Sequence, residues 1–151
     1  GPMVIEFNCR FGDPEAQVLL PTFSADLYEL LWAAATGELS DADGPAGRKG
    51  HAVGVVLASG GYPQQYQTGY HINGLDWLDD ETLVFHAGTK SVDGRLVTDG
   101  GRVMTVVGRG DSLAEARAKA YDRVRNISFE RAIFRTDIAD VVEETITWPS
   151  R

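Results

Sequence analysis

The sequence contains a single cysteine, Cys9, among its 151 residues. An internal disulfide is therefore excluded, and a lone thiol suits a reducing compartment, so we expect a cytoplasmic location. A lone cysteine can also be a nucleophile, but Cys9 follows Ile5 and Phe7 at alternate positions of an apolar strand face. We therefore interpret Cys9 as a packing residue.

Positive charge is scarce as well, because 14 Lys and Arg stand against 22 Asp and Glu and give a formal net charge of −8. Nucleic-acid phosphates require a basic surface, so nucleic-acid binding is not expected. The same acidity disfavours anionic membranes, and no apolar run approaches the roughly 20 residues that span a bilayer. We expect neither a nucleic-acid nor a membrane partner for this chain, whose length suits one globular domain.

Polar residues near the start of the chain are the first candidates for chemistry. Residues 4–11 alternate as in a strand, which places Glu6, Asn8 and Arg10 on one face before a Gly-Asp-Pro turn. A carboxylate, an amide oxygen and a guanidinium in a row can hold a hard cation beside an anionic group. The alternative is a polar, solvent-facing side of an edge strand.

A first helix is predicted shortly after this turn. Ser24 is a suitable N-cap, the leucines and alanines of residues 27–35 follow at helical spacing with one buried face, and Gly37 ends the helix. Residues 39–50 are rich in Gly, Asp and Ala and are predicted to form a surface loop.

The second predicted helix covers residues 113–127 and is the best defined. Ser112 and Glu115 form a capping box, and Glu115 and Lys119 form a favourable i,i+4 pair. Its apolar stripe contains small alanines, which permit close packing on a sheet.

Short apolar runs separated by turn signals predict an antiparallel meander, so the expected fold class is α+β. The expected strands are residues 52–57, 82–86, 95–98 and 102–107, with a last strand or extended segment within 129–138.

Two glycine motifs, Gly60-Gly61-Tyr62-Pro63 and Asp99-Gly100-Gly101-Arg102, are interpreted as hairpin turns because neither matches a phosphate-binding loop. The three histidines are far apart and lack a metal-binding spacing. Arg102 either supports a phosphate or pairs with an acid of the first strand, and both alternatives stay open.

Five motifs occur in the order typical of one enzyme family: VIEFNCRFGDPE (residues 4–15), GGYP (60–63), VFHAGT (84–89), TDGGRVM (98–104) and FRTDI (134–138). They resemble those of the phosphoribosylamine–glycine ligases (glycinamide ribonucleotide synthetases), ATP-grasp enzymes of purine biosynthesis. The departures, such as Ala16 for the usual Thr, concern loops and not the implied metal ligands.

The resemblance implies a role for each polar residue of the first segment. Glu6 and Asn8 would bind the Mg²⁺ (or Mn²⁺) that bridges ATP phosphates, and Arg10, the implied catalytic residue, would stabilise the transferring phosphoryl group or the acyl phosphate. Asp13 and His86 are candidate substrate-binding residues, although Asp13 also simply makes a turn. The implied reaction joins glycine to 5-phosphoribosylamine at the expense of ATP, through glycyl phosphate.

The family's enzymes are much longer than this chain, so we expect a C-terminal fragment that is inactive alone. Its expected parts are a tag scar and start methionine (1–3), the strand and helix that end an ATP-grasp domain (4–40), a loop (41–50), a small antiparallel sheet domain packed with one long helix (51–139) and an acidic tail (140–151).

The alternative to a fragment is a stand-alone non-catalytic module, or a split subunit that docks to a separate ATP-grasp half. In the family the sheet neighbours of the strand at 4–11 belong to the preceding part of the enzyme, so we expect this strand to be disordered or to self-associate by swapping into a neighbouring chain.

Overall fold

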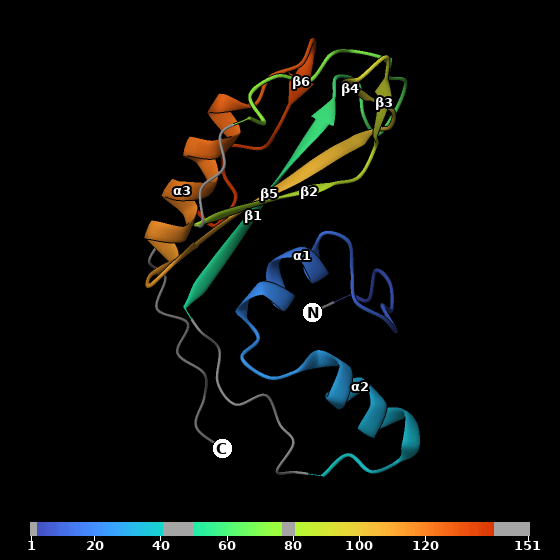
Figure 1. The fold of residues 1–151 in the computed structure, drawn as a ribbon, viewed down its shortest axis with the longest axis vertical. Coiled ribbons are helices and arrows are strands. Elements are labelled where there is room, and N and C mark those ends of the chain that lie inside the picture. The colour runs from blue at the N-terminus through green and yellow to red at the C-terminus, as the bar shows by residue number, and fades with distance from the viewer. Residues whose placement is uncertain (1–2, 41–49, 77–80, 141–151) are drawn as a thin grey trace.

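A computed structural model of the chain describes residues 3–40, 50–76 and 81–140 (Figure 1). The elements are α1 (Glu15–Leu19), the 3-10 helix η1 (Leu20–Thr22), α2 (Leu27–Thr36), β1 (His51–Ser59), β2 (Thr82–His86), β3 (Thr89–Val92), β4 (Arg95–Thr98), β5 (Arg102–Gly110), α3 (Leu113–Asn126) and β6 (Ala132–Ile133). The α+β class is confirmed. The described helices include none that is long and apolar enough to cross a membrane. The expected loop at 41–49 and the tail from 141 lie outside the described residues.

The main sheet has the strand order β2-β5-β1-β6, with every neighbouring pair antiparallel. The predicted meander is wrong, because β5 lies between β1 and β2 instead of at the end of the series. Six consecutive residues of β5 are buried, and such a strand is stable only where neighbours cover both of its edges and both of its faces. Turn signals report which strands are adjacent in sequence, and they do not report which strand is central.

A separate two-stranded hairpin of β3 and β4 lies beside the main sheet (Figure 1). Its first strand, β3, is absent from the strands expected from the sequence, and the turn after it consists of Asp93 and Gly94. Both turn residues have positive φ, 50° and 76°, as the tight turn of a two-residue hairpin requires.

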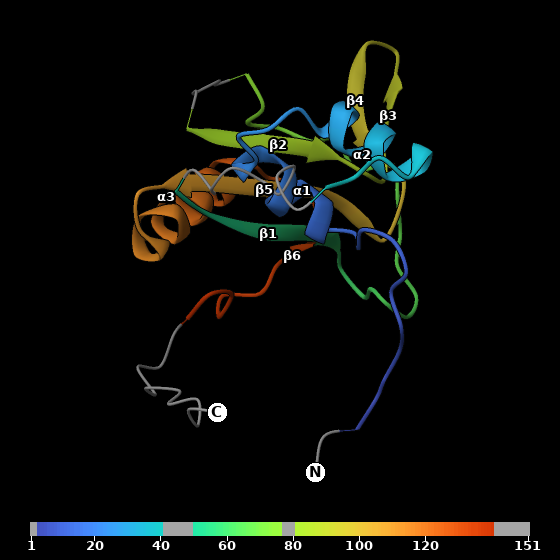
Figure 2. The ribbon, with the colours of Figure 1, turned by 90° about the horizontal axis from the view of Figure 1, so that it is seen from below.

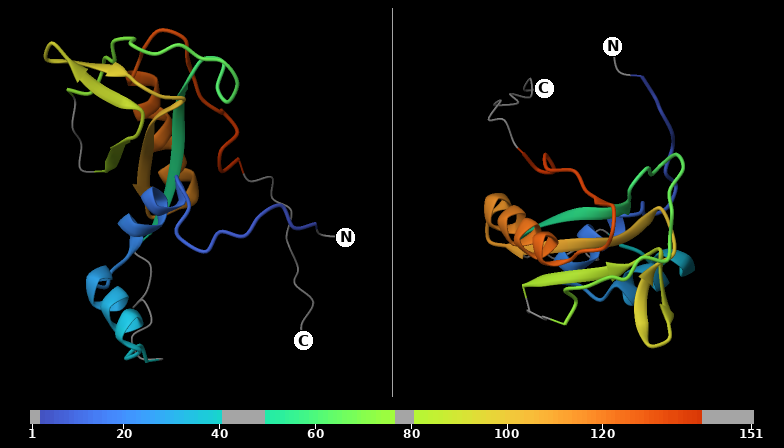
Figure 3. Two further views of the ribbon diagram at one scale, coloured as in Figure 1. Left: turned by 90° about the vertical axis from the view of Figure 1, so that its right-hand side faces the viewer. Right: turned by 90° about the horizontal axis from the view of Figure 1, so that it is seen from above.

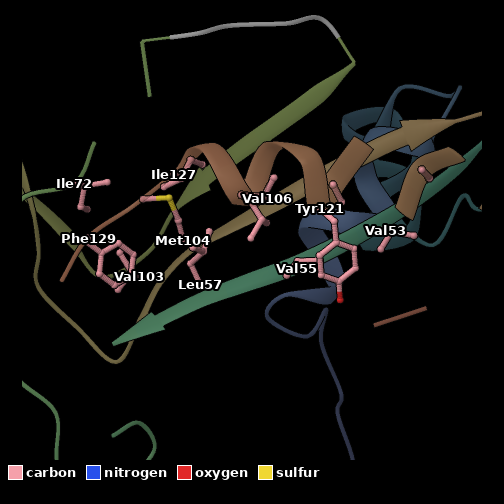
Figure 4. Packing of buried hydrophobic residues seen from close by; sticks show 13 residues of the cluster. Val53, Val55, Leu57, Ile72, Val103, Met104, Val106, Tyr121, Ile127 and Phe129 are labelled. Carbon is pink, nitrogen blue, oxygen red and sulfur yellow. The ribbon is translucent and has the colours of Figure 1, made fainter. Parts of the chain in front are cut away.

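Helix α3 covers one face of the sheet and forms the core with it (Figures 1 and 4). Ala116 and Ala120 of the helix are fully buried, and Gly108 of β5 lies against their backbone. Figure 4 shows side chains of the sheet, of α3 and of the segment after it converging between these layers. The cluster contains Val53, Val55, Leu57, Ile72, Val103, Met104, Val106, Tyr121, Val124, Ile127 and Phe129.

The start of α3 confirms part of the predicted capping box. The Ser112 side chain accepts a hydrogen bond from the Glu115 backbone N–H at 3.2 Å. The Glu115 carboxylate accepts from the backbone N–H of Asp111, one residue before the expected donor. Lys119 pairs with Glu115 at 2.7 Å and with Glu81 at 3.0 Å. The hydrogen bond from Lys119 lowers the pKa of Glu115, and the bond to Glu115 raises the pKa of Lys119.

Helix α2 differs from the prediction in two respects. Its N-cap is Asp26, whose carboxylate accepts from the N–H groups of Tyr28 and Glu29, and not Ser24. Its expected buried face is also wrong, because no residue of α2 is buried and Trp32 is 57% exposed. Gly37 ends the helix in the left-handed conformation, as expected. The helical spacing identified an apolar face correctly, but the part of the chain that the structure describes does not cover it.

Residues 50–140 are expected to fold without the preceding segment, because every member of the buried cluster lies within them. A protein of these residues should unfold cooperatively, with a melting temperature within a few degrees of that of the full chain. Thermal unfolding and the dispersion of a two-dimensional NMR spectrum measure this. A non-cooperative transition with collapsed amide shifts would show that residues 3–40 are part of the folding unit.

Candidate functional site

Residues 3–12 form no strand, so the predicted strand at 4–11 is wrong as an element of this structure. The segment runs away from the sheet (Figure 2), and Ile5 and Phe7 are 97% and 84% exposed. Cys9 is a free, exposed thiol rather than the expected packing residue. A strand requires a neighbour for its backbone groups, and this segment pairs with none of the described strands. The expected swap of this segment into a neighbouring chain stays a prediction.

The three polar side chains of this segment nevertheless lie in a row. The Asn8 amide Nδ2 donates to Glu6 Oε1 at 2.9 Å, and Arg10 Nη1 donates to Asn8 Oδ1 at 2.9 Å. Arg10 Nη1 also donates to the Phe11 carbonyl at 3.1 Å. All three residues are exposed. The alternation predicted from the sequence thus brings these groups together even without a strand.

This donor set fits a hard divalent cation but does not complete its coordination. Glu6 and Asn8 offer carboxylate and amide oxygens, which Mg²⁺ and Mn²⁺ accept, and Mg²⁺ is commonly held by one or two protein groups plus waters and phosphates. The Asn8 Oδ1 atom that would bind the cation also accepts the hydrogen bond from Arg10. Among the described residues no group of three or more His, Cys, Asp or Glu side chains gathers to hold a metal. Further ligands must therefore come from outside this group.

The Gly-Asp-Pro turn that follows is bound to the start of β5. Arg102 Nη1 donates to the Asp13 carbonyl oxygen at 2.6 Å, and its Nη2 donates to Asp13 Oδ2 at 3.1 Å. The other carboxylate oxygen, Oδ1, accepts from the Gln17 amide at 2.9 Å. Of the two alternatives for Arg102, the structure therefore supports pairing with an acid, although that acid belongs to the turn and not to the strand.

Three glycine-containing motifs meet at the end of the sheet where Arg102 lies. Ser59 donates from its backbone N–H to the Gly101 carbonyl and from its hydroxyl to the Gly100 carbonyl, both at 2.8 Å. The Gly88 N–H donates to the Arg102 carbonyl at 2.9 Å. A Cβ on Gly88 would lie only 2.6 Å from the Gly100 Cα, so this close backbone contact requires glycine. The expected turns at 60–63 and 99–102 are therefore parts of one packed junction.

The three histidines lie on different parts of the fold. His86, the candidate substrate ligand, is exposed at the end of β2, with its Nδ1 3.2 Å from the Thr89 hydroxyl. His71 forms an isolated bridge with Val97. His51 begins β1 beside a cavity of about 610 Å³ between that strand, α1 and Leu113. Glu6, Asn8 and Arg10 are not among the residues that line this cavity.

Helix α1 connects the turn to the sheet on the face opposite α3 (Figure 3). Val18 of α1 lies against Gly54 of β1, where a Cβ would meet its methyl group at 2.5 Å. Glu15 caps the turn, since its carboxylate accepts from the Gly12 N–H at 3.1 Å. The row of polar side chains is thus attached to the sheet through Arg102 and through α1.

Comparison with known proteins gives one family and a set of relatives. Residues 52–141 match the family model described as "Phosphoribosylglycinamide synthetase, C domain". The chain is 47% identical over 140 residues to the phosphoribosylamine–glycine ligase of Caulobacter vibrioides, covering 91% of this chain and 33% of that protein. For the protein of the same name from Halalkalibacterium halodurans the identity is 44% over 138 residues, covering 91% and 32%.

A solved structure agrees with these relatives. The crystal structure of a phosphoribosylamine–glycine ligase from Thermotoga maritima is similar with a TM-score of 0.76 and 37% identity, covering 90% of this chain and 33% of that one. The chain therefore spans about a third of the length of the relatives that it matches.

Proposed function

Because the chain belongs to the phosphoribosylglycinamide synthetase C-domain family, we propose that it forms one part of an ATP-dependent ligase that joins glycine to 5-phosphoribosylamine. The observation that carries this proposal is the similarity to named phosphoribosylamine–glycine ligases over about nine tenths of the chain. That similarity extends beyond residues 52–141 into the part of the chain that precedes the C domain. We place this ligase in purine biosynthesis and in the cytoplasm.

In the proposed reaction the γ-phosphoryl group of ATP passes to the glycine carboxylate, which yields glycyl phosphate and ADP. The amine of 5-phosphoribosylamine then attacks the acyl carbon, phosphate leaves and the nitrogen loses a proton. The products are glycinamide ribonucleotide, ADP and phosphate.

Glu6 and Asn8 would hold a divalent cation, Mg²⁺ or Mn²⁺, at the ATP phosphates; such an ion neutralises charge on the transferring phosphoryl group. Arg10 adjoins these ligands and presents a planar fork of N–H donors. A guanidinium of this kind makes two charge-assisted hydrogen bonds to an oxyanion. We assign Arg10 to the oxygens that gain negative charge during phosphoryl transfer. In this role Arg10 would exchange its bond to Asn8 for bonds to the substrate.

We further propose that the chain is not catalytic by itself. Two protein oxygens bind a strongly hydrated Mg²⁺ ion weakly, and positioning of both substrates requires a complete cleft. The exposed apolar residues before the C domain, including Ile5, Phe7 and Trp32, support contact with further protein. The remainder of the ligase would cover them, and in its absence a second copy of the chain would do so.

A chimeric ligase tests this function. This chain would replace the matching third of the Caulobacter vibrioides relative, and formation of glycinamide ribonucleotide would be measured with the isolated chain as control. We expect the chimera to be active and the isolated chain to show no turnover. A chimera that is folded and binds ATP but forms no product would overturn the proposed function, as would turnover by the isolated chain.

A further inference from the structure

The contact between Arg102 and Asp13 joins parts of the chain that are 89 positions apart in sequence. Arg102 begins β5 within the C domain, whereas Asp13 follows Arg10 by three residues. One guanidinium makes two hydrogen bonds to the same residue, one to its main chain and one to its carboxylate. Two-pronged bonds of this kind fix orientation as well as distance.

The Arg102 end of this contact is itself held by neighbouring groups. The backbone of Arg102 accepts from Gly88, and the preceding Gly100 and Gly101 are bound by Ser59. A Cβ on Gly101 would overlap the Tyr62 ring, so the loop before Arg102 has little room to shift. The base of the Arg102 side chain therefore has a fixed place at the end of the sheet.

Each carboxylate oxygen of Asp13 already accepts one hydrogen bond in this arrangement. Its Oδ2 accepts from Arg102 and its Oδ1 accepts from Gln17. A substrate ammonium group would have to share this carboxylate with Arg102 and Gln17. The geometry thus favours a role within the turn over direct contact with substrate.

We propose that Arg102 is a positioning residue, which acts through Asp13 to set the direction of the Glu6–Arg10 segment relative to the C domain. This inference rests on the proposed function, because positioning concerns the reaction to which Glu6, Asn8 and Arg10 contribute. The two side chains are 40% and 52% exposed, and exposed ion pairs contribute little to stability. Loss of the contact should therefore affect turnover much more than unfolding.

In the chimeric ligase, Arg102→Ala is expected to lower kcat about ten- to a hundredfold, the cost of misplacing catalytic groups by about 1 Å. KM for glycine and for 5-phosphoribosylamine should stay within about twofold, since neither substrate is contacted. Arg102→Lys keeps the charge without the planar fork, and its kcat should lie between those of the alanine variant and the unmodified chimera.

Asp13→Asn distinguishes positioning from substrate binding. It leaves the main-chain bond to Arg102 intact, so its kcat should fall less than that of Arg102→Ala, with unchanged KM for glycine. The double variant should be no slower than Arg102→Ala, because both changes remove one interaction. A rise of tenfold or more in KM for glycine with Asp13→Asn alone would place Asp13 on the substrate and overturn the inference.

Lys90→Ala is the matched control. Lys90 and Asp99 form another exposed ion pair, at 2.8 Å with exposures of 49% and 44%, outside the proposed contact. Its removal should leave kcat unchanged. An equal loss of kcat in the Lys90 and Arg102 variants would show that no specific positioning exists.

A second measurement uses the isolated chain and does not depend on activity. In ¹⁵N relaxation, Arg102→Ala should lower the order parameters of residues 11–15 from rigid values of about 0.85 to below about 0.6. The melting temperature should stay the same. Unchanged order parameters would overturn the positioning role even if the chimera were active. If the unmodified chimera were inactive but Arg102→Ala still lowered the order parameters of the isolated chain, only the proposed function would be contradicted.

Discussion

Replacement of Arg10 by alanine in the chimeric ligase is expected to lower kcat by about 10²–10³, the usual cost of removing one preorganised donor from a developing oxyanion. Arg10 is exposed and donates from Nη1 to Asn8 Oδ1 at 2.9 Å and to the Phe11 carbonyl at 3.1 Å. Because its contacts are surface contacts, the melting temperature of the variant should match that of the parent. Steady-state kinetics and thermal unfolding of the same preparations measure both.

Two further variants define what Arg10 contributes. Arg10→Lys retains the charge and loses the fork, so part of the activity should return. Arg125→Ala is the matched control, because Arg125 is an exposed arginine paired with Asp122 on α3, remote from the proposed chemistry. The kcat of this control should stay within about threefold of that of the parent. If the kcat of Arg10→Ala also stays within that range, Arg10 has no catalytic role.

Gly108→Ala is expected to destabilise the chain by about 3 kcal/mol, the upper part of the usual range for overpacking. A Cβ at this position of β5 would overlap the Ala116 carbonyl oxygen and the Ala120 amide nitrogen, and would lie 3.0 Å from the Ala120 Cα. These are backbone atoms of α3, so relief requires the whole helix to move from the sheet. For a domain of this size the melting temperature should fall by more than about 10 °C.

The same substitution at Gly54 is the control for Gly108. There the new Cβ would overlap the Val18 methyl group, on the opposite face of the sheet, and would make ordinary contacts with the methyl groups of Thr105 and Val107. A single side chain can rotate, and alanine is favoured over glycine in a strand interior by about 0.5–1 kcal/mol. The net change should therefore be less than about 1 kcal/mol. Equal destabilisation by the two variants would contradict the tight packing of α3 on β5.

Some elements of the fold follow from local sequence, whereas others depend on distant contacts. Helix α3 was predictable because its cap, its apolar stripe and its i,i+4 pair all lie within 15 consecutive residues. The close approach of its alanines to the sheet was also expected, although the partner glycine in β5 was not. Strands β1, β2, β4 and β5 follow from local apolar runs, whereas the central place of β5 depends on which strands bury it from both sides.

The candidate site shows the same division between local and distant information. The row of Glu6, Asn8 and Arg10 follows from alternation along the backbone, even though the segment has no strand partner among the described residues. No local pattern connects Asp13 with Arg102, so sequence reasoning could only leave the arginine between two roles. The burial expected for α2 and Cys9 is wrong in this structure. Apolar spacing predicts which face of an element is apolar, but it does not show which part of a protein packs against that face.

In the proposed ligation, Glu6 and Asn8 would bind the required divalent cation. This binding is tested most directly by the Mg²⁺ concentration that gives half-maximal turnover in the chimeric ligase, at saturating ATP. Glu6→Gln replaces a charged oxygen ligand with a neutral one, so this concentration should rise by about tenfold or more, equivalent to about 1.4 kcal/mol of lost binding. Asn8→Ala should raise it as well, and Glu29→Gln on α2 should leave it unchanged. An unchanged half-maximal Mg²⁺ concentration in a folded, active Glu6→Gln chimera would contradict the account.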